Sequence, residues 1–198
     1  MTLIDEIVAS LEASLSKSGE VSIALSGGSS PTVLYEGLSS IDLDWARVRV
    51  TLIDDRLVPA DHDDSNQKLV RNTLLRGKAA RAEFIRLQDW PEGNLPDIAI
   101  LGMGTDGHFA SLFPAMMDDE RAFDLAAGPA VITTAPMGHP LCARITMNLS
   151  MILAIPNRVL MVVGEEKEAV LNAALNGEDL PITRLLAHDG TQIYHERV

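Results

Sequence analysis

One segment of the chain combines three glycines with an acidic residue and a histidine, directly after an apolar run. It reads ILGMGTDGHFASLFP and spans residues 100–114. A histidine with a nearby carboxylate is the usual way to build a general base near neutral pH. We therefore expect glycines such as Gly104 to turn the end of a strand sharply and to expose Asp106 and His108. The alternative is that His108 only caps a tight loop.

The same segment also fits G-x-G-x-x-G, the dinucleotide-binding fingerprint, at Gly102, Gly104 and Gly107. That fingerprint needs a helix opening at its last glycine and an acidic residue ending the next strand, ~20 residues further on. Pro114 closes the segment soon after Gly107, and the next apolar run ends in threonines. The sequence therefore favours general-base chemistry over nucleotide binding.

A second stretch, SGGSSP at residues 26–31, has the composition of an anion site. Gly27 and Gly28 let the backbone approach a ligand closely. The hydroxyl groups of Ser26, Ser29 and Ser30, with the free amides of a helix start, would favour a phosphate. Ser30 also suits the N-cap of the following helix, so the alternative is a tight turn with a helix cap. The stretch lacks the G-K-[ST] ending of a P-loop.

Three basic residues lie where a helix start or a strand end could present them to an anion. Asp54, Asp55 and Arg56 follow the apolar run 48–53, and an arginine can bind a phosphate or carboxylate with two parallel hydrogen bonds. Arg144 begins another apolar run. Lys167 lies in the first turn of a predicted helix, where the helix dipole disfavours a cation, and this hints at an anionic partner. The alternatives are a solvated loop and ordinary surface charges.

Short apolar runs alternate with amphipathic stretches along most of the chain. We expect strands at 21–25, 48–53, 97–103, 130–134, 143–147, 158–164 and 192–196, and helices near 4–15, 32–38, 68–75, 165–175 and 180–188. This alternation predicts an α/β fold: a mostly parallel, doubly wound sheet with helices on both faces, Rossmann-like in three layers. We expect one domain, residues 1–198, whose least structured part is the segment 114–128.

The overall charge narrows the classes of partner. A net charge of −12 over 198 residues would repel nucleic acid and anionic membranes, so we expect neither as a partner, and any anion site must be locally positive. The N-terminal stretch does not have the pattern of a signal peptide, and no apolar run approaches the ~20 residues that span a membrane. We therefore expect a cytoplasmic protein.

The remaining cysteine and histidines are expected to be inert. Cys142 stands alone among apolar residues, which favours a part-buried thiol over a nucleophile. The other histidines are scattered without metal-ligand spacing, so we expect no metal and interpret each as solvated or capping: His62, His139, His188 and His195.

Taken in order, several segments resemble the 6-phosphogluconolactonases. They are LSGGSSP, IDDRLVP…SN, LGMGTDGHFASLFP, ARITMN and GEEKEAVL, and together they span about residues 21–186. The most specific is D-G-H-x-A-S-L-F-P. The related glucosamine-6-phosphate deaminases of the same superfamily resemble D-G-H-I-A-F-N-E-P there instead and carry a glutamate for ring opening.

The resemblance implies a hydrolase without metal or cofactor, which converts 6-phospho-D-glucono-1,5-lactone to 6-phospho-D-gluconate in the oxidative pentose phosphate pathway, as a monomer or homodimer. The catalytic histidine falls on His108 and its supporting aspartate on Asp106, while the family's D-E-R triplet falls on residues 54–56 and adds Asp54 and Arg56 to the catalytic set. Substrate-binding positions fall on Ser26, Gly27, Gly28, Ser29, Ser30, Gly104, Arg144 and Lys167.

Three departures from the family pattern bear on these roles. Phe109 replaces the usual threonine after the histidine, and we expect its bulky ring beside the base either to narrow the pocket or to alter substrate preference. Asp55 replaces a glutamate, and Ser30 replaces a threonine. Two other functions remain open: an isomerase or deaminase for amino-sugar phosphates with Asp54 as the base, and a sugar-phosphate-binding protein without turnover.

Overall fold

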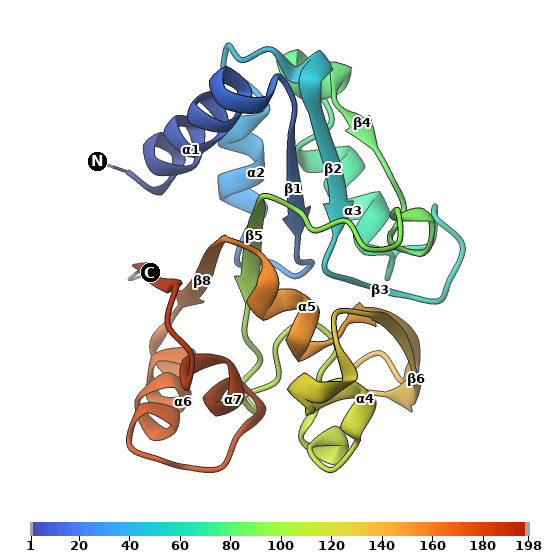
Figure 1. Cartoon of the computed structure of the whole chain (residues 1–198), viewed down its shortest axis with the longest axis vertical. Helices are drawn as coiled ribbons and strands as arrows, with labels where there is room; N and C mark the ends of the chain where they lie inside the picture. The colour runs from blue at the N-terminus through green and yellow to red at the C-terminus, as the bar shows by residue number, and fades with distance from the viewer. Residues whose placement is uncertain (1, 197–198) are drawn as a thin grey trace.

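The computed structural model describes residues 2–196 and contains two sheets (Figure 1). The larger sheet has six parallel strands in the order β4-β2-β1-β5-β8-β9. Their bounds are β1 Val21–Leu25, β2 Val48–Leu52, β4 Glu83–Phe84, β5 Ile98–Gly102, β8 Asn157–Val163 and β9 Thr191–Glu196. The predicted parallel sheet is therefore confirmed, including the edge strand near the C-terminus.

A second, three-stranded antiparallel sheet was not expected. It consists of β3 Asp54–Arg56, β7 Cys142–Met147 and β6 Val131–Met137, with β7 in the centre. The expected strands near 130–134 and 143–147 exist, but they form a hairpin rather than joining the parallel sheet. Ile145 and Met147 of β7 are buried, whereas most of β6 is partly or fully exposed. An outer strand that faces solvent, as β6 does, suits an antiparallel sheet.

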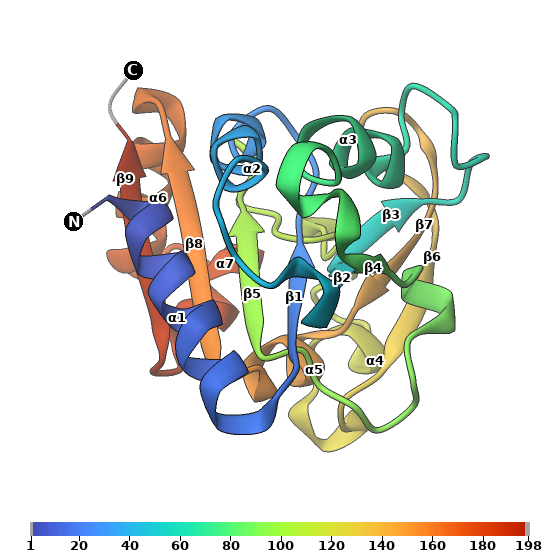
Figure 2. The same ribbon diagram turned by 90° about the horizontal axis from the view of Figure 1, so that it is seen from above.

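Helices cover both faces of the large sheet, as predicted (Figures 1 and 2). Helices α1 Leu3–Ser18, α2 Thr32–Leu38 and α3 Asn66–Thr73 lie on one side, and α4 Glu120–Phe123, α5 Leu149–Ala154, α6 Glu165–Leu175 and α7 Pro181–Leu186 lie on the other with the second sheet. Segment 114–128, expected to be the least structured part of the chain, contains α4 and two 3₁₀ turns. None of the helices in the described part of the chain is both long and apolar enough to cross a membrane.

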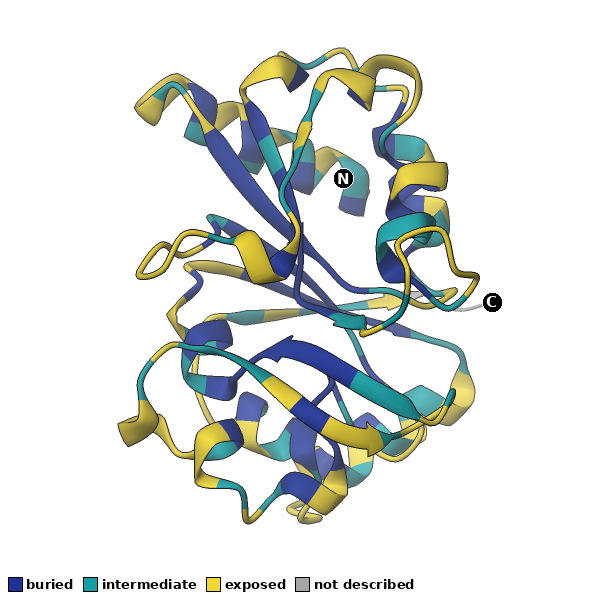
Figure 3. Cartoon of the chain, turned by 90° about the vertical axis from the view of Figure 1, so that its right-hand side faces the viewer, coloured by how far each residue is buried: buried dark blue, intermediate teal, exposed yellow. Residues whose placement is uncertain are grey.

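Side chains of the central strands alternate between two apolar cores. In β1, Ile23 packs with α1–α3 and Ala24 packs with the opposite core. In β5, Ile100 likewise packs in the core with α1–α3, and Leu101 packs in the opposite core. The buried centre of the sheet is visible in Figure 3. These strands are apolar on both faces because a layer of structure covers each face.

The strand order indicates which edge of the sheet is suited to bind a ligand. Counted along the chain within this sheet alone, the order is 3-2-1-4-5-6, and β1 lies beside β5 where the winding reverses. In open α/β sheets the crevice outside the carboxyl ends of such a strand pair binds ligands. The loops after β1 and β5 are SGGSS and the glycine-rich segment that ends in His108, so the two sequence motifs meet at this point.

Candidate active site

One cavity opens at this edge of the sheet and collects residues from six separate segments. Its lining residues are Ser26, Gly27, Gly28, Ser29, Ser30, Asp54, Arg56, Asn66, Gly102, Met103, Gly104, His108, Ala110, His139, Arg144 and Lys167. Every predicted site residue except Asp106 lines this cavity. Asp106 lies behind His108 and reaches the cavity only through that imidazole.

His108 and Asp106 form a hydrogen-bonded pair at the mouth of the loop. The Nδ1 atom of His108 lies 2.5 Å from Oδ1 of Asp106, and the same carboxylate accepts the His108 backbone amide at 3.2 Å. The hydrogen bond from His108 is the main reason that the pKa of Asp106 is lowered. With Nδ1 engaged by a carboxylate, Nε2 is the ring nitrogen free to take a proton from a water in the cavity.

Gly104 is the residue that lets this pair form. The loop closes through a hydrogen bond from the Gly104 amide to the His108 carbonyl oxygen at 2.8 Å, and Gly107 adopts a positive φ of 77°. A Cβ atom on Gly104 would lie 2.2 Å from Cε1 of His108 and 2.7 Å from Oδ1 of Asp106. The imidazole therefore occupies the space that a side chain at residue 104 would need.

The loop after β1 lies against the opposite wall of the cavity. Ser26 is buried, its amide donates to Ile100 of β5, and its carbonyl oxygen accepts the Tyr35 hydroxyl at 2.8 Å. A Cβ on Gly27 would lie 1.8 Å from Oδ1 of Asn66, so the Asn66 side chain at the start of α3 occupies the space that a side chain at residue 27 would need. Gly28 has a positive φ of 92°, which carries the backbone across the cavity towards α2.

Ser30 has a different role from the predicted helix cap. The N-cap of α2 is Pro31, and no side chain caps that helix. The hydroxyl group of Ser30 instead accepts a hydrogen bond from Nζ of Lys167 at 2.8 Å, across 137 residues of sequence. Burial lowers the pKa of Lys167. An amine that gives up solvation for one hydroxyl partner is suited to an anionic ligand.

Two arginines lie directly opposite each other on neighbouring strands of the second sheet. Arg56 of β3 pairs in register with Arg144 of β7, an arrangement that is destabilising unless an anion compensates it. Burial and the charge of Arg56 lower the pKa of Arg144. The guanidinium of Arg144 donates to the carbonyl oxygens of Met137, His139 and Pro140, at 3.1–3.2 Å.

The three cations of the cavity, Arg56, Arg144 and Lys167, share one feature. The ion pairs within residues 2–196 are made by other side chains, so none of the three is neutralised by a carboxylate within 4.0 Å. On a chain with a net charge of −12, such a cluster is a locally positive site. It has the charge and the donors to bind a phosphate.

The two aspartates of the DDR triplet differ in role. Asp54 is buried and lines the cavity, and its Oδ2 accepts the Ser111 hydroxyl at 2.5 Å. Asp55 faces away and accepts the backbone amides of Asn66 and Gln67, at 2.7 and 3.3 Å, at the N-terminus of α3. Burial raises the pKa of Asp55, against the effect of these hydrogen bonds. Asp55 thus anchors a helix, as a one-carbon-longer residue could also do.

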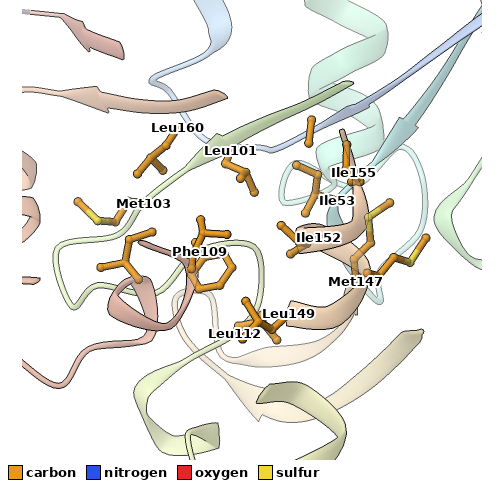
Figure 4. Packing of buried hydrophobic residues seen from close by; sticks show 14 of the residues in the cluster. Ile53, Leu101, Met103, Phe109, Leu112, Met147, Leu149, Ile152, Ile155 and Leu160 are labelled. Carbon is orange, nitrogen blue, oxygen red and sulfur yellow. The ribbon is translucent and has the colours of Figure 1, made fainter. Parts of the chain in front are cut away.

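The expectation that Phe109 narrows the cavity is wrong. Its side chain is fully buried and packs in the core below the large sheet, near Leu112, Leu149 and Ile152 (Figure 4). The backbone of Phe109 makes isolated bridges to Met103 and Leu112, which turn the side chain inwards, next to an imidazole that points out. Successive residues of extended backbone face opposite sides, and this alternation places the ring in the core.

Two lining residues with polar side chains, Asn66 and His139, are absent from the predicted set. Asn66 is buried and its Nδ2 donates to the Asp54 carbonyl oxygen at 2.9 Å. Asn66 ends the family-like segment IDDRLVP…SN, but its position directly after a helix-capping serine suggested no role in the site. His139 was interpreted as solvated or capping, but the turn between β6 and β7 brings it to the cavity. The antiparallel hairpin that places it there was itself not expected.

Comparison with known proteins identifies the family of this chain. The family model for glucosamine-6-phosphate isomerases/6-phosphogluconolactonase matches residues 1–194. The chain belongs to this family.

Relatives in this family include enzymes from several bacteria. The 6-phosphogluconolactonase of Neisseria meningitidis is 37% identical over 212 residues, covering 98% of this chain and 91% of the relative. The one from Pseudomonas putida is 39% identical over 211 residues, covering 98% of this chain and 86% of the relative. The crystal structure of a 6-phosphogluconolactonase from Shewanella baltica OS155 superposes with a TM-score of 0.84 at 33% identity, covering 98% of this chain and 91% of that one.

Proposed function

We propose that this chain hydrolyses 6-phospho-D-glucono-1,5-lactone to 6-phospho-D-gluconate in the oxidative pentose phosphate pathway, with His108 as the general base. The observation that carries this proposal is the juxtaposition, in one cavity, of His108, held by Asp106, with three cations that form no ion pair with a carboxylate of residues 2–196. A phosphorylated ester is a substrate that would use both.

The reaction needs one water and no redox partner. Nε2 of His108 takes a proton from the water as its oxygen bonds to the lactone carbonyl carbon, and negative charge develops on the carbonyl oxygen. Arg56 or backbone amides of the glycine-rich loops stabilise this charge, at about 3 kcal/mol per donor. As the bond from carbon to the ring oxygen breaks, the His108 imidazolium returns its proton to that oxygen. Asp106 holds the ring and favours its charged form.

The phosphate lies at the other end of the substrate, and its binding positions the ester. Lys167, Arg144 and the amides and hydroxyls of residues 26–30 bind its oxygens. Binding energy from this remote group is used for orientation at the reacting carbon. The carboxylate of Asp54, fixed by Ser111, accepts a hydrogen bond from a sugar hydroxyl between the two ends.

The direct test is a coupled assay with freshly generated lactone, corrected for spontaneous hydrolysis. Proton transfer by a positioned histidine contributes ~10²–10⁴-fold, so His108→Ala should lower kcat by at least about a hundredfold while the fold survives. Near-normal turnover of this variant would remove His108 from the mechanism. Release of ammonia from glucosamine 6-phosphate, with no lactone hydrolysis, would favour the isomerase or deaminase reaction with Asp54 as the base.

Tight binding of the sugar phosphate without either reaction would identify a binding protein instead. We place the activity in the cytoplasm, in a monomer or homodimer that needs neither metal nor cofactor and does not bind nucleic acid or membranes. Full turnover of protein treated with a chelator tests the independence from metal.

A further inference from the structure

Phe113, at the end of the glycine-rich segment, contacts both the proposed general base and a cation of the proposed phosphate site, but the mechanism above gives it no role. Phe113 is 5% exposed and belongs to the core below the large sheet. Its ring centroid lies 4.6 Å from that of the His108 imidazole, with 34° between the ring planes. The Cζ atom of Arg144 lies 5.2 Å from the same Phe113 centroid. One ring therefore contacts both the general base and a cation of the phosphate site.

The hairpin between β6 and β7 closes over this ring. A Cβ atom on Gly138 would lie 2.6 Å from Cζ of Phe113 and 3.0 Å from Nη2 of Arg144. Gly138 has a positive φ of 74°, so glycine is favoured both by the conformation and by the lack of space. The guanidinium of Arg144 in turn holds the carbonyl oxygens of His139 and Pro140. Phe113 is thus fixed between the loop that carries the base and the hairpin that carries the cation.

We propose that Phe113 is a positioning residue that sets the separation between His108 and Arg144. This inference rests on the proposed function, because the covalent frame of the substrate fixes the distance between phosphate and lactone carbon. A protein that binds one end and reacts at the other must hold its own groups at a matching distance. An aromatic ring is suited to this task, because its π system attracts the guanidinium and also the imidazolium that forms when His108 accepts a proton.

The test is Phe113→Leu, which keeps an apolar side chain and removes the ring. We expect kcat to fall and KM to rise together, with kcat/KM lowered about tenfold to a hundredfold, as the loss of two aromatic contacts implies. The matched control is Phe84→Leu in β4. Arg71 lies over the Phe84 ring with its Cζ 5.0 Å from the centroid, but Phe84 packs in the opposite core, away from the cavity. This variant should keep both kinetic constants.

A second measurement separates positioning from a contribution to stability alone. Calorimetry with inorganic phosphate should show a weaker Kd for Phe113→Leu than for the wild type and for Phe84→Leu, because Arg144 loses the ring that holds it. A lower Tm with unchanged phosphate Kd and unchanged KM would overturn the proposal. This readout is independent of turnover, so the two failures are distinguishable. A wild type that binds phosphate but does not hydrolyse the lactone would count against the proposed function, whereas an unchanged phosphate Kd in Phe113→Leu counts against this inference.

A variant on the surface covers the case in which Phe113→Leu does not fold. Gly138→Ala presses on the same ring and guanidinium from the exposed hairpin. It should weaken phosphate binding and lower kcat in the same direction. Wild-type values for both in Gly138→Ala would equally overturn the role of Phe113.

Discussion

Gly104→Ala is the substitution whose effect follows most directly from the geometry. The new methyl group would lie 2.2 Å from Cε1 and 2.3 Å from Nδ1 of His108, whereas ordinary contacts begin at 3.4 Å. The imidazole must therefore move by about 1 Å, and a displacement of that size can cost about a hundredfold in rate. The φ of Gly104 is not in the positive range, so an alanine there does not strain the backbone. We expect kcat to fall by about a hundredfold with a normal fold.

The assay is lactone turnover with the thermal midpoint measured alongside it. Gly37→Ala is the matched control, since its Cβ would meet Cδ1 of Ile4 at 2.4 Å, in α2 and away from the cavity. This control has a comparably short contact, with the end of a flexible side chain remote from the cavity, so it should leave kcat unchanged. Undiminished turnover of Gly104→Ala would show that the position of the imidazole against Asp106 does not limit the reaction.

Two further substitutions probe the cavity wall. Lys167→Met should raise KM for the lactone and raise the free energy of unfolding at neutral pH, because it removes an amine whose pKa burial lowers from 10.5. Between that lowered pKa and 10.5, the folded wild type binds fewer protons than the unfolded wild type, so its free energy of unfolding rises with pH. The difference in free energy of unfolding between Lys167→Met and the wild type should therefore narrow over this pH range. Urea unfolding at several pH values measures this difference, and a constant difference would refute the reasoning. Ser111→Ala deprives the buried Asp54 carboxylate of its 2.5 Å partner and should cost about 1.5–3 kcal/mol of unfolding free energy, whereas a neutral effect would mean that Asp54 finds another donor.

Much of the fold could be predicted because its signals are local. The strands β5 and β8 are apolar on both faces, and α6 combines helix-forming residues with acidic residues in its first turn. The place where ligands bind then follows from strand order, which brings the loops after β1 and β5 together. The prediction that His108, Asp106 and the loop 26–30 belong to one site needed no further information.

The contacts that were not predicted are long-range. The pairing of Arg56 with Arg144 depends on a second sheet, and a run such as CARITM looks the same in a parallel strand as in a hairpin. Ser30 is a residue type that favours a helix N-cap, but its hydroxyl group accepts a hydrogen bond from Lys167, 137 residues further along the chain. The direction of the Phe109 ring is decided by the isolated bridges of its backbone, for which the sequence carries no pattern.

The contact between Ser30 and Lys167 joins residues 137 positions apart and completes the cavity from its two most distant segments. A chain that has folded only the first strands of the large sheet therefore has the loop 26–30 in place, but Lys167 and Arg144 do not yet line the cavity. Since the ligand then binds the complete native state far better than any partial one, it stabilises that state by RT ln(1 + [L]/Kd). Under the proposed function, binding of the sugar phosphate therefore stabilises the association of a segment from the first third of the sequence with one from the last third.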